Sequence, residues 1–184
     1  MNREEALKLL ENKVQTVNLV KHSLAVEAAM KELARHFDEN EEKWALTGLW
    51  HDIDYEETKN QPEKHSLVGA QFLKDKGIGE DITEAIKTHN ERHGLEPQSK
   101  MAKSLFCVDP LTGLIVAATL VLPSKKIQDL TIENVLNRFK EKGFAKGAKR
   151  EIIEQCESLL GLSLEEFVTI VLRGMQKISQ ELGL

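Results

Sequence analysis

Residues 49–54 of this 184-residue chain read Leu-Trp-His-Asp-Ile-Asp, so the adjacent ionisable side chains of His51 and Asp52 lie between apolar residues on both sides. Asp52 follows Leu49 by three positions, which on a helix places both side chains on one face. A buried carboxylate without a partner costs roughly several kcal/mol of desolvation. The segment therefore predicts a helix whose acidic group needs a buried partner, and other parts of the chain must supply that partner.

Apolar residues recur every three or four positions on both sides of this segment, and no stretch shows several cycles of strict alternation. Leu, Glu, Lys, Ala and Ile are abundant, whereas aromatic residues make up only 5% of the chain, and this composition favours helices over sheets. We predict an all-α bundle forming one domain over residues 1–184. Its helices are expected near residues 3–13, 16–37, 40–53, 62–76, 79–91, 98–122, 131–142, 147–160 and 163–182.

Two local signals refine these helices. Pro110 falls inside the segment 98–122, where it removes a backbone donor, so we expect that helix to kink or restart beside Asp109. Ser163 precedes Glu166 by three positions and an apolar run follows, which is the pattern of a capping box at the start of the last helix.

Further histidines and a second aspartate lie on the apolar sides of the predicted helices. His22 belongs to a stripe of residues spaced by three or four positions, and the same holds for His65, His89 and Asp109. The apolar neighbours at helical spacing are Leu19, Val26, Met30, Leu33 and Phe37 for the first, Gly69 and Phe72 for the second, Ile82, Ala85 and Ile86 for the third, and Leu105 and Phe106 for the fourth.

One histidine on an apolar face is more often a core residue than a ligand. Four histidines and two aspartates on five successive helices indicate more, because a bound cation would offset the cost of burying the carboxylates. Imidazole and carboxylate donors suit Fe, Mn, Zn, Co or Ni, and the absence of thiolates argues against a closed structural zinc site. Six ligands are too many for one catalytic ion with room for water. We therefore expect a divalent transition metal, as one ion or as two ions that share a carboxylate.

The net charge of −5 disfavours non-specific nucleic-acid binding, which depends on a surplus of Lys and Arg. We expect a small phosphate-containing substrate and no nucleic acid polymer. The only two cysteines, Cys107 and Cys156, lack metal-ligand spacing and are interpreted as reduced thiols. The amino terminus is acidic and lacks the features of a secretion signal. The longest apolar run, residues 112–122, is too short to cross a bilayer. We therefore expect a cytoplasmic protein without a membrane contact.

The order His22, then His51-Asp52, then Asp109 resembles the signature of the HD-domain metal-dependent phosphohydrolases, over about residues 18–122. His65 and His89 are similar to the two extra histidines of the binuclear branches of that superfamily. The resemblance implies an HD-type helical bundle, followed here by a helical extension over about residues 131–184. It also implies that His22, His51, Asp52 and Asp109 surround one metal and that Asp52, the central catalytic residue, bridges to a second metal held by His65 and His89.

The sequence departs from that family at three points. Asp54 and Tyr55 follow Ile53, where many members have glycine and often lysine. A Gly-Tyr-Pro motif is missing, which disfavours a cyclic-dinucleotide phosphodiesterase, and Asn90 rather than a second histidine follows His89. These departures leave the substrate open.

Charged residues outside the ligand set supply further candidates. Lys64, Arg92 and Lys125 are predicted to contact the substrate phosphate, and Lys59, which also lies near the proposed ligands, is a further candidate. For the acidic residues after the site we consider either proton transfer or a solvated loop; they are Asp54, Glu56 and Glu57. For a second basic group we consider phosphate recognition and, as the favoured interpretation, a flexible loop beside a C-terminal helix dipole; its members are Lys140, Lys142, Lys146, Lys149 and Arg150. His36 and His93 are interpreted as surface residues.

The leading hypothesis is metal-dependent hydrolysis of a phosphate ester or anhydride, with nucleotides among the candidate substrates. One alternative is an HD-type di-iron oxygenase resembling myo-inositol oxygenase, since that class has the same six-ligand pattern. A second alternative is a non-catalytic sensor that binds a nucleotide or metal. The sequence leaves the substrate, the metal and the oligomeric state open.

Overall fold

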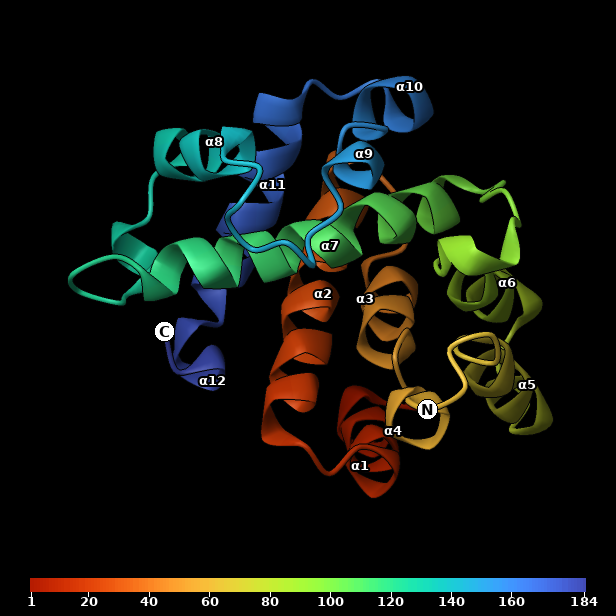
Figure 1. Cartoon of the computed structure of the whole chain (residues 1–184). Helices are drawn as coiled ribbons and strands as arrows, with labels where there is room; N and C mark the ends of the chain where they lie inside the picture. Colours follow the sequence, from red (N-terminus) through yellow and green to blue (C-terminus); the bar gives the residue numbers. More distant parts are fainter.

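The computed structural model describes residues 1–184 and contains helices without strands, which confirms the predicted all-α fold (Figure 1). The elements are α1 (Arg3–Lys13), α2 (Val17–His36), α3 (Glu41–Trp50), α4 (Tyr55–Thr58), α5 (Leu67–Asp75), α6 (Glu80–Thr88), η1 (Glu91–His93), α7 (Lys100–Leu120), η2 (Ile127–Asp129), α8 (Ile132–Lys140), α9 (Arg150–Ile153), α10 (Cys156–Leu160), α11 (Leu164–Lys177) and α12 (Ser179–Leu182).

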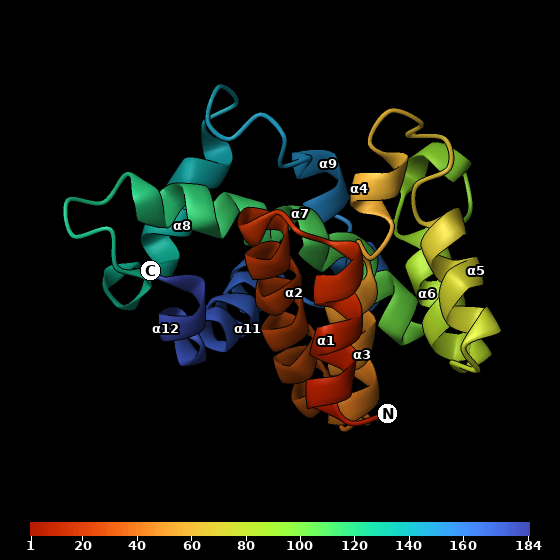
Figure 2. The ribbon, with the colours of Figure 1, turned by 90° about the horizontal axis from the view of Figure 1, so that it is seen from below.

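The centre of the fold is α2, which packs against α3, α7 and α11. α7 crosses α2 and α3, while α5 and α6 lie to one side of them and α8, α11 and α12 to the other (Figures 1 and 2). Gly48 permits the close approach of α3 to α2, because a Cβ at this position would lie 2.7 Å from the Val26 carbonyl oxygen. The tight α2–α3 pair thus brings the first and second parts of the His-Asp pattern together.

One hydrophobic core extends through both halves of the chain. It contains large, fully buried side chains from α1 and α3 and equally buried ones from α7 and α11, including Leu10, Leu49, Leu114 and Phe167. α8, α9 and α10 pack on α7. The C-terminal helices therefore cover the same long helix that carries Asp109.

α7 corrects the sequence interpretation of Pro110. The helix is assigned without interruption from Lys100 to Leu120, so the predicted restart beside Asp109 is wrong. A proline removes one hydrogen bond, but Val108 and Leu111 on either side of it are fully buried, and this tertiary packing stabilises the continuous helix. α7 is also long and apolar enough to cross a membrane, yet 67% of its most apolar window is buried within the protein, as in the core helix of a globular domain.

Several helix ends differ from the predicted bounds. α3 ends at Trp50, so a turn occupies the last three residues of the predicted helix 40–53, and the short α4 follows it. The segment 147–160 divides into α9 and α10, and 163–182 divides into α11 and α12. The capping box of α11 is confirmed, because the Ser163 side chain accepts a hydrogen bond from the Glu166 amide and the Glu166 side chain accepts one from the Ser163 amide.

Candidate metal centre

Five parts of the fold deliver the six side chains of the predicted ligand set to one place. His22 comes from α2, His51 and Asp52 from the turn that ends α3, and Asp109 from the middle of α7. His65 precedes α5, and His89 is the C-terminal cap residue of α6. All four histidines and both aspartates thus converge, although they span 87 positions of sequence (from His22 to Asp109).

The Asp52 carboxylate lies between two pairs of histidines. Its Oδ2 atom is 3.8 Å from His22 Nε2 and 3.4 Å from His51 Nε2. Its Oδ1 atom is 3.1 Å from His65 Nε2 and 3.5 Å from His89 Nε2. Each oxygen of one buried carboxylate therefore faces a different pair of imidazoles, which is the arrangement needed to bridge two ions.

Asp109 completes the first of these groups. Its Oδ1 atom is 2.9 Å from His22 Nε2 and 3.6 Å from His51 Nε2, and the two imidazole Nε2 atoms are 3.2 Å apart. Donor atoms that share one ion at about 2.0–2.2 Å are about 3.0–3.5 Å apart in tetrahedral or octahedral geometry. The spacing of these donors therefore fits one divalent ion.

The opposite nitrogens of three imidazoles are held by buried acceptors. His51 Nδ1 donates to the Gly48 carbonyl at 2.8 Å, and His89 Nδ1 donates to the Ile86 carbonyl at 2.6 Å. His65 Nδ1 donates to Asp54 Oδ1 at 2.9 Å. These hydrogen bonds place the proton on Nδ1 and leave the Nε2 lone pair free to bind a metal, as is usual for metal-ligating histidines.

Asp54, whose role the sequence left open, is buried beside the proposed ligands. Its side chain is 2% exposed, and it accepts hydrogen bonds from His65 Nδ1 and, at 2.7 Å, from the Gly69 amide. Neither a solvated loop nor a proton donor to a leaving group agrees with that burial. Glu56 and Glu57 lie farther out, where they accept hydrogen bonds from the Thr16 amide and the Lys13 ammonium. In the sequence, only its place two residues after Asp52 pointed to Asp54.

The segment after His89 also positions His65. The Asn90 side chain donates to the His65 carbonyl at 3.1 Å, and His93 Nε2 donates to the same oxygen at 2.7 Å. The interpretation of His93 as a simple surface residue is therefore wrong, since its imidazole is half-buried and tied to the backbone of another site residue. His36, by contrast, is exposed as predicted.

Electrostatic coupling within the cluster is strong. Burial lowers the pKa of His51, but the charge of Asp52 and a hydrogen bond with Asp109 oppose this and raise the pKa to about 9. Burial also lowers the pKa of His65, but hydrogen bonds with Asp52 and Asp54 outweigh burial and raise this pKa to about 10. For Asp52 and Asp109 burial raises the pKa, yet the neighbouring histidines hold both carboxyl pKa values well below their usual range. Without a metal the cluster therefore holds protons where a metal would bind.

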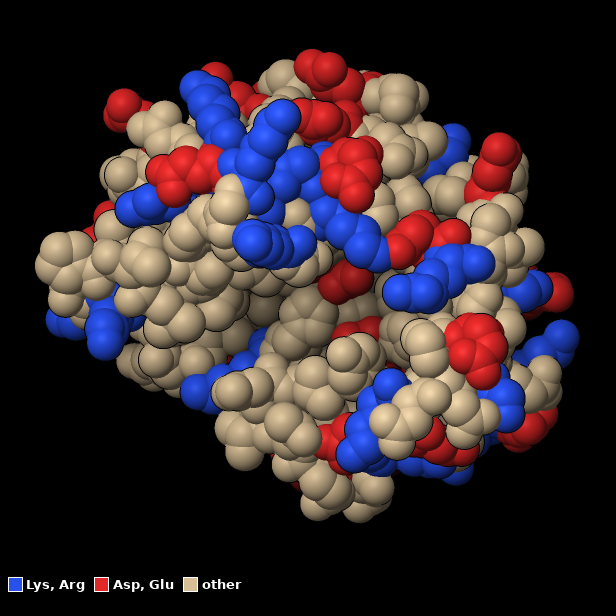
Figure 3. Space-filling model, viewed as in Figure 1, with Lys and Arg blue, Asp and Glu red and all other residues tan.

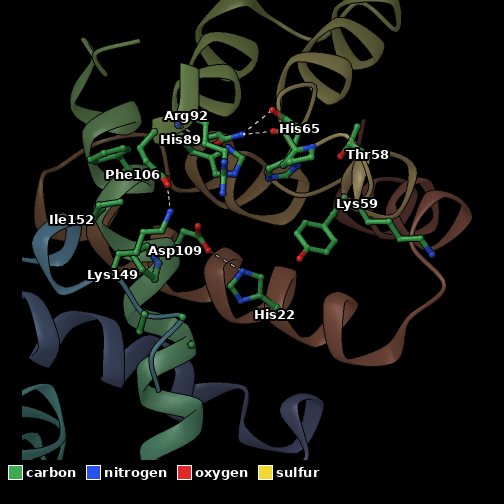
Figure 4. Close-up of a pocket in the computed structure, with 18 residues that line it drawn as sticks. His22, Thr58, Lys59, His65, His89, Arg92, Phe106, Asp109, Lys149 and Ile152 are labelled. Carbon is green, nitrogen blue, oxygen red and sulfur yellow. Dashed lines mark hydrogen bonds and ion pairs between the residues drawn. The ribbon is translucent and has the colours of Figure 1, made fainter. Parts of the chain in front are cut away.

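A pocket of about 450 Å³ opens above these side chains (Figure 4). His22, His65, His89 and Asp109 lie in its wall, together with the apolar Phe106 and Ile152. The space-filling view shows a hollow in this face, with Lys and Arg side chains gathered above it (Figure 3). The pocket has the size and mixed polarity of a small-molecule site.

Only one of the three predicted substrate contacts lies in the pocket wall. Arg92 lines the pocket. Lys64 is exposed outside it, and Lys125 lies in the turn beyond α7, so the structure gives neither residue a place at the site. Lys59, which the sequence also singled out, lines the pocket as well, and so does Lys149.

Comparison with known proteins agrees with this geometry. The family model described as HD domain matches residues 19–114, a range that contains all six residues of the ligand set. The chain belongs to the HD-domain family. That family of metal-dependent phosphohydrolases was the one that the His-Asp pattern resembled, so the prediction is confirmed.

Curated relatives of the HD-domain chain are longer than this chain. Ribonuclease Y of Lawsonia intracellularis is 29% identical over 140 residues, covering 74% of this chain and 27% of the relative. Ribonuclease Y of Nitratidesulfovibrio vulgaris strain DP4 is 31% identical over 140 residues, covering 73% and 26%. The chain thus spans about a quarter of the length of these relatives. No solved structure matches it.

Proposed function

We propose that this HD-domain protein is a metal-dependent phosphohydrolase that cleaves a phosphate ester or anhydride. The observation that carries the proposal is the Asp52 carboxylate, whose two oxygens face separate pairs of histidine Nε2 atoms beneath a pocket. A pair of cations held in this way is suited to the charge that develops on a phosphoryl group.

The residues divide into two groups for two ions. His22, His51, Asp109 and Asp52 Oδ2 would hold the first, while His65, His89 and Asp52 Oδ1 would hold the second. The second group has fewer protein donors and therefore has more room for water or a phosphate oxygen. When bound, divalent ions supply Lewis-acid stabilisation of the phosphoryl charge and make water a stronger acid.

The chain's own residues bind and orient the substrate in this proposal. Arg92 and Lys59 offer donors for phosphate oxygens on the pocket wall, and Phe106 contributes apolar surface. In the net reaction the oxygen of water forms a bond to phosphorus and the bond to the leaving oxygen breaks. One proton of the water goes to the leaving oxygen, and the other remains with the acidic phosphate product or passes to solvent.

The names of the relatives widen the candidate substrates. Those proteins are called ribonucleases, so ribonucleotide phosphodiesters join mononucleotides as substrates to be tested. The expectation that the chain acts on no nucleic acid polymer, which rested on its net charge, stays a prediction.

The decisive experiment compares wild type with Asp52→Ala on nucleotides, sugar phosphates and short RNA, with Mn, Fe, Co, Ni or Zn added. We expect metal-dependent product release by the wild type, and loss of both metal content and turnover in the variant with its helical circular dichroism retained. Full turnover by the variant would contradict the proposal. Oxygen consumption with stoichiometric iron would favour the oxygenase, and tight ligand binding without turnover the sensor.

A further inference from the structure

A segment beyond the matched HD region forms one wall of the pocket. The family match ends at residue 114, yet Gly147, Ala148, Lys149 and Ile152 line the pocket above the metal ligands (Figure 4). α9, in which Ile152 lies, packs on α7, the helix that carries Asp109. The C-terminal extension is therefore part of the site and not only a cover for the helical core.

The loop that precedes α9 is held in shape by Arg150. Its guanidinium donates to the carbonyl oxygens of Phe144 and Ala148, both at 2.6 Å, and to that of Ala145 at 2.8 Å. Longer hydrogen bonds reach the carbonyls of Phe139 at 3.3 Å and Arg138 at 3.4 Å. One side chain thus ties the end of α8 to the start of α9. These hydrogen bonds give the segment, which the sequence led us to expect as a flexible loop, a defined backbone path from Ala145 to Ala148, next to which Lys149 lines the pocket.

Apart from the proposed metal ligands, the charged side chains that line the pocket are mostly positive. Lys59, Arg92 and Lys149 line it, and Glu91 is the only carboxylate in the wall besides Asp109. Lys149 forms an ion pair with Glu91, whereas Lys59 and Arg92 have no carboxylate partner. The ions, together with Lys59 and Arg92, would offset the charge of a phosphate at the metal centre, so Lys149 is available for a different anionic group.

We infer that Lys149 and the Arg150-tied loop bind a second anionic group of the substrate, so that the preferred substrate carries a further phosphate beyond the one that is cleaved. This inference rests on the proposed function and specifies its substrate class. Glu91 holds Lys149 in place while the pocket is empty, and the second phosphate replaces Glu91 as its partner. Phe106 and Ile152 provide apolar surface in the same pocket for the uncharged part that joins the two phosphates.

The test measures binding with ligands that cannot be hydrolysed. Alkane-α,ω-bisphosphonates with three to six carbons and the matching alkyl monophosphonates are titrated calorimetrically into the full chain loaded with Mn. We expect the best bisphosphonate to bind at least about 10-fold tighter than its monophosphonate, the gain typical of one charge-assisted contact. Lys149→Ala should remove that gain and leave monophosphonate affinity within about 2-fold.

Two further variants distinguish the contact made by Lys149 from the loop conformation that positions it. Lys146 is exposed in the same loop and does not line the pocket, so Lys146→Ala should bind both ligands as the wild type does. Arg150 acts as a positioning residue, and Arg150→Ala should reproduce the selective loss of bisphosphonate affinity while helical circular dichroism is retained. Equal affinity for the two ligand types, or an equal loss for both in Lys149→Ala, would overturn the inference.

The outcomes also distinguish this inference from the proposed function. Metal-dependent hydrolysis of a monophosphate without any preference for bisphosphonates would overturn only the second phosphate site. Absence of both hydrolysis and phosphonate binding in the Mn-loaded protein would overturn both.

Discussion

Asp54→Asn isolates the contribution of a residue that touches no metal in the proposed site. The carboxylate accepts hydrogen bonds on both oxygens, from His65 Nδ1 at 2.9 Å and from the Gly69 amide at 2.7 Å. Asparagine has nearly the same shape but one acceptor oxygen, so its amide group would face one of these two N–H donors.

The size of the effect follows from burial. Asp54 is 2% exposed, so water cannot replace the lost acceptor. Leaving a buried donor unpaired costs about 1–3 kcal/mol of folding free energy. His65 also loses the carboxylate that fixes its ring and raises its basicity, and loss of such a partner typically lowers metal affinity about 10–100-fold.

The assay is a competition of the metal-loaded protein with a chelator, together with urea unfolding of the metal-free form. We expect the ion bound by His65 and His89 to be released at lower chelator concentration, with the ion bound by His22 and Asp109 less affected. Glu57→Gln is the matched control, because Glu57 is exposed in the same acidic segment and pairs with Lys13 at the surface. Metal affinity within twofold of wild type in Asp54→Asn would refute the reasoning.

Two other predictions concern the metal-free protein and the helix packing. The folded-state pKa values of His51 and His65 are raised to about 9 and about 10, so their stabilising contribution is complete below about pH 6.5 and is lost as the pH rises towards 10. Urea unfolding without metal should show stability falling between pH 7 and 10, and an unchanged free energy of unfolding over that range would contradict the coupling. Gly48→Ala should destabilise the fold by about 1–3 kcal/mol or more, because its Cβ would lie 2.7 Å from the Val26 carbonyl oxygen. Thermal unfolding measures this, and an unchanged midpoint would show that α2 and α3 can separate without cost.

The spacing of apolar residues along the chain was enough to predict the helical fold and the candidate ligands. A histidine such as His22 within an apolar stripe must point inward, because helical periodicity fixes which side of the helix it occupies. The order of His51-Asp52 and Asp109 then indicated which inward side chains belong together, and the structure brings their donor atoms within 3.6 Å.

Local pattern failed where tertiary packing outweighs backbone preference. Pro110 predicts a kink or a restart, yet α7 does not restart there, because buried side chains on both sides of the proline stabilise the helix. α3 ends at Trp50, three residues before the predicted end, and the turn that follows it depends on distant partners such as the Gly69 amide, which donates a hydrogen bond to Asp54 from fifteen positions away.

What the sequence by itself determined was the set of inward-facing donors, and with it the all-α class and the family, because periodicity and residue order are properties of the chain alone. Only the tertiary structure decided what surrounds those donors. Lys64, Lys125 and Lys149 look alike in sequence, but only Lys149 lines the pocket. Its place depends on Arg150 and on the packing of α9 against α7, which are contacts between segments that no local pattern encodes.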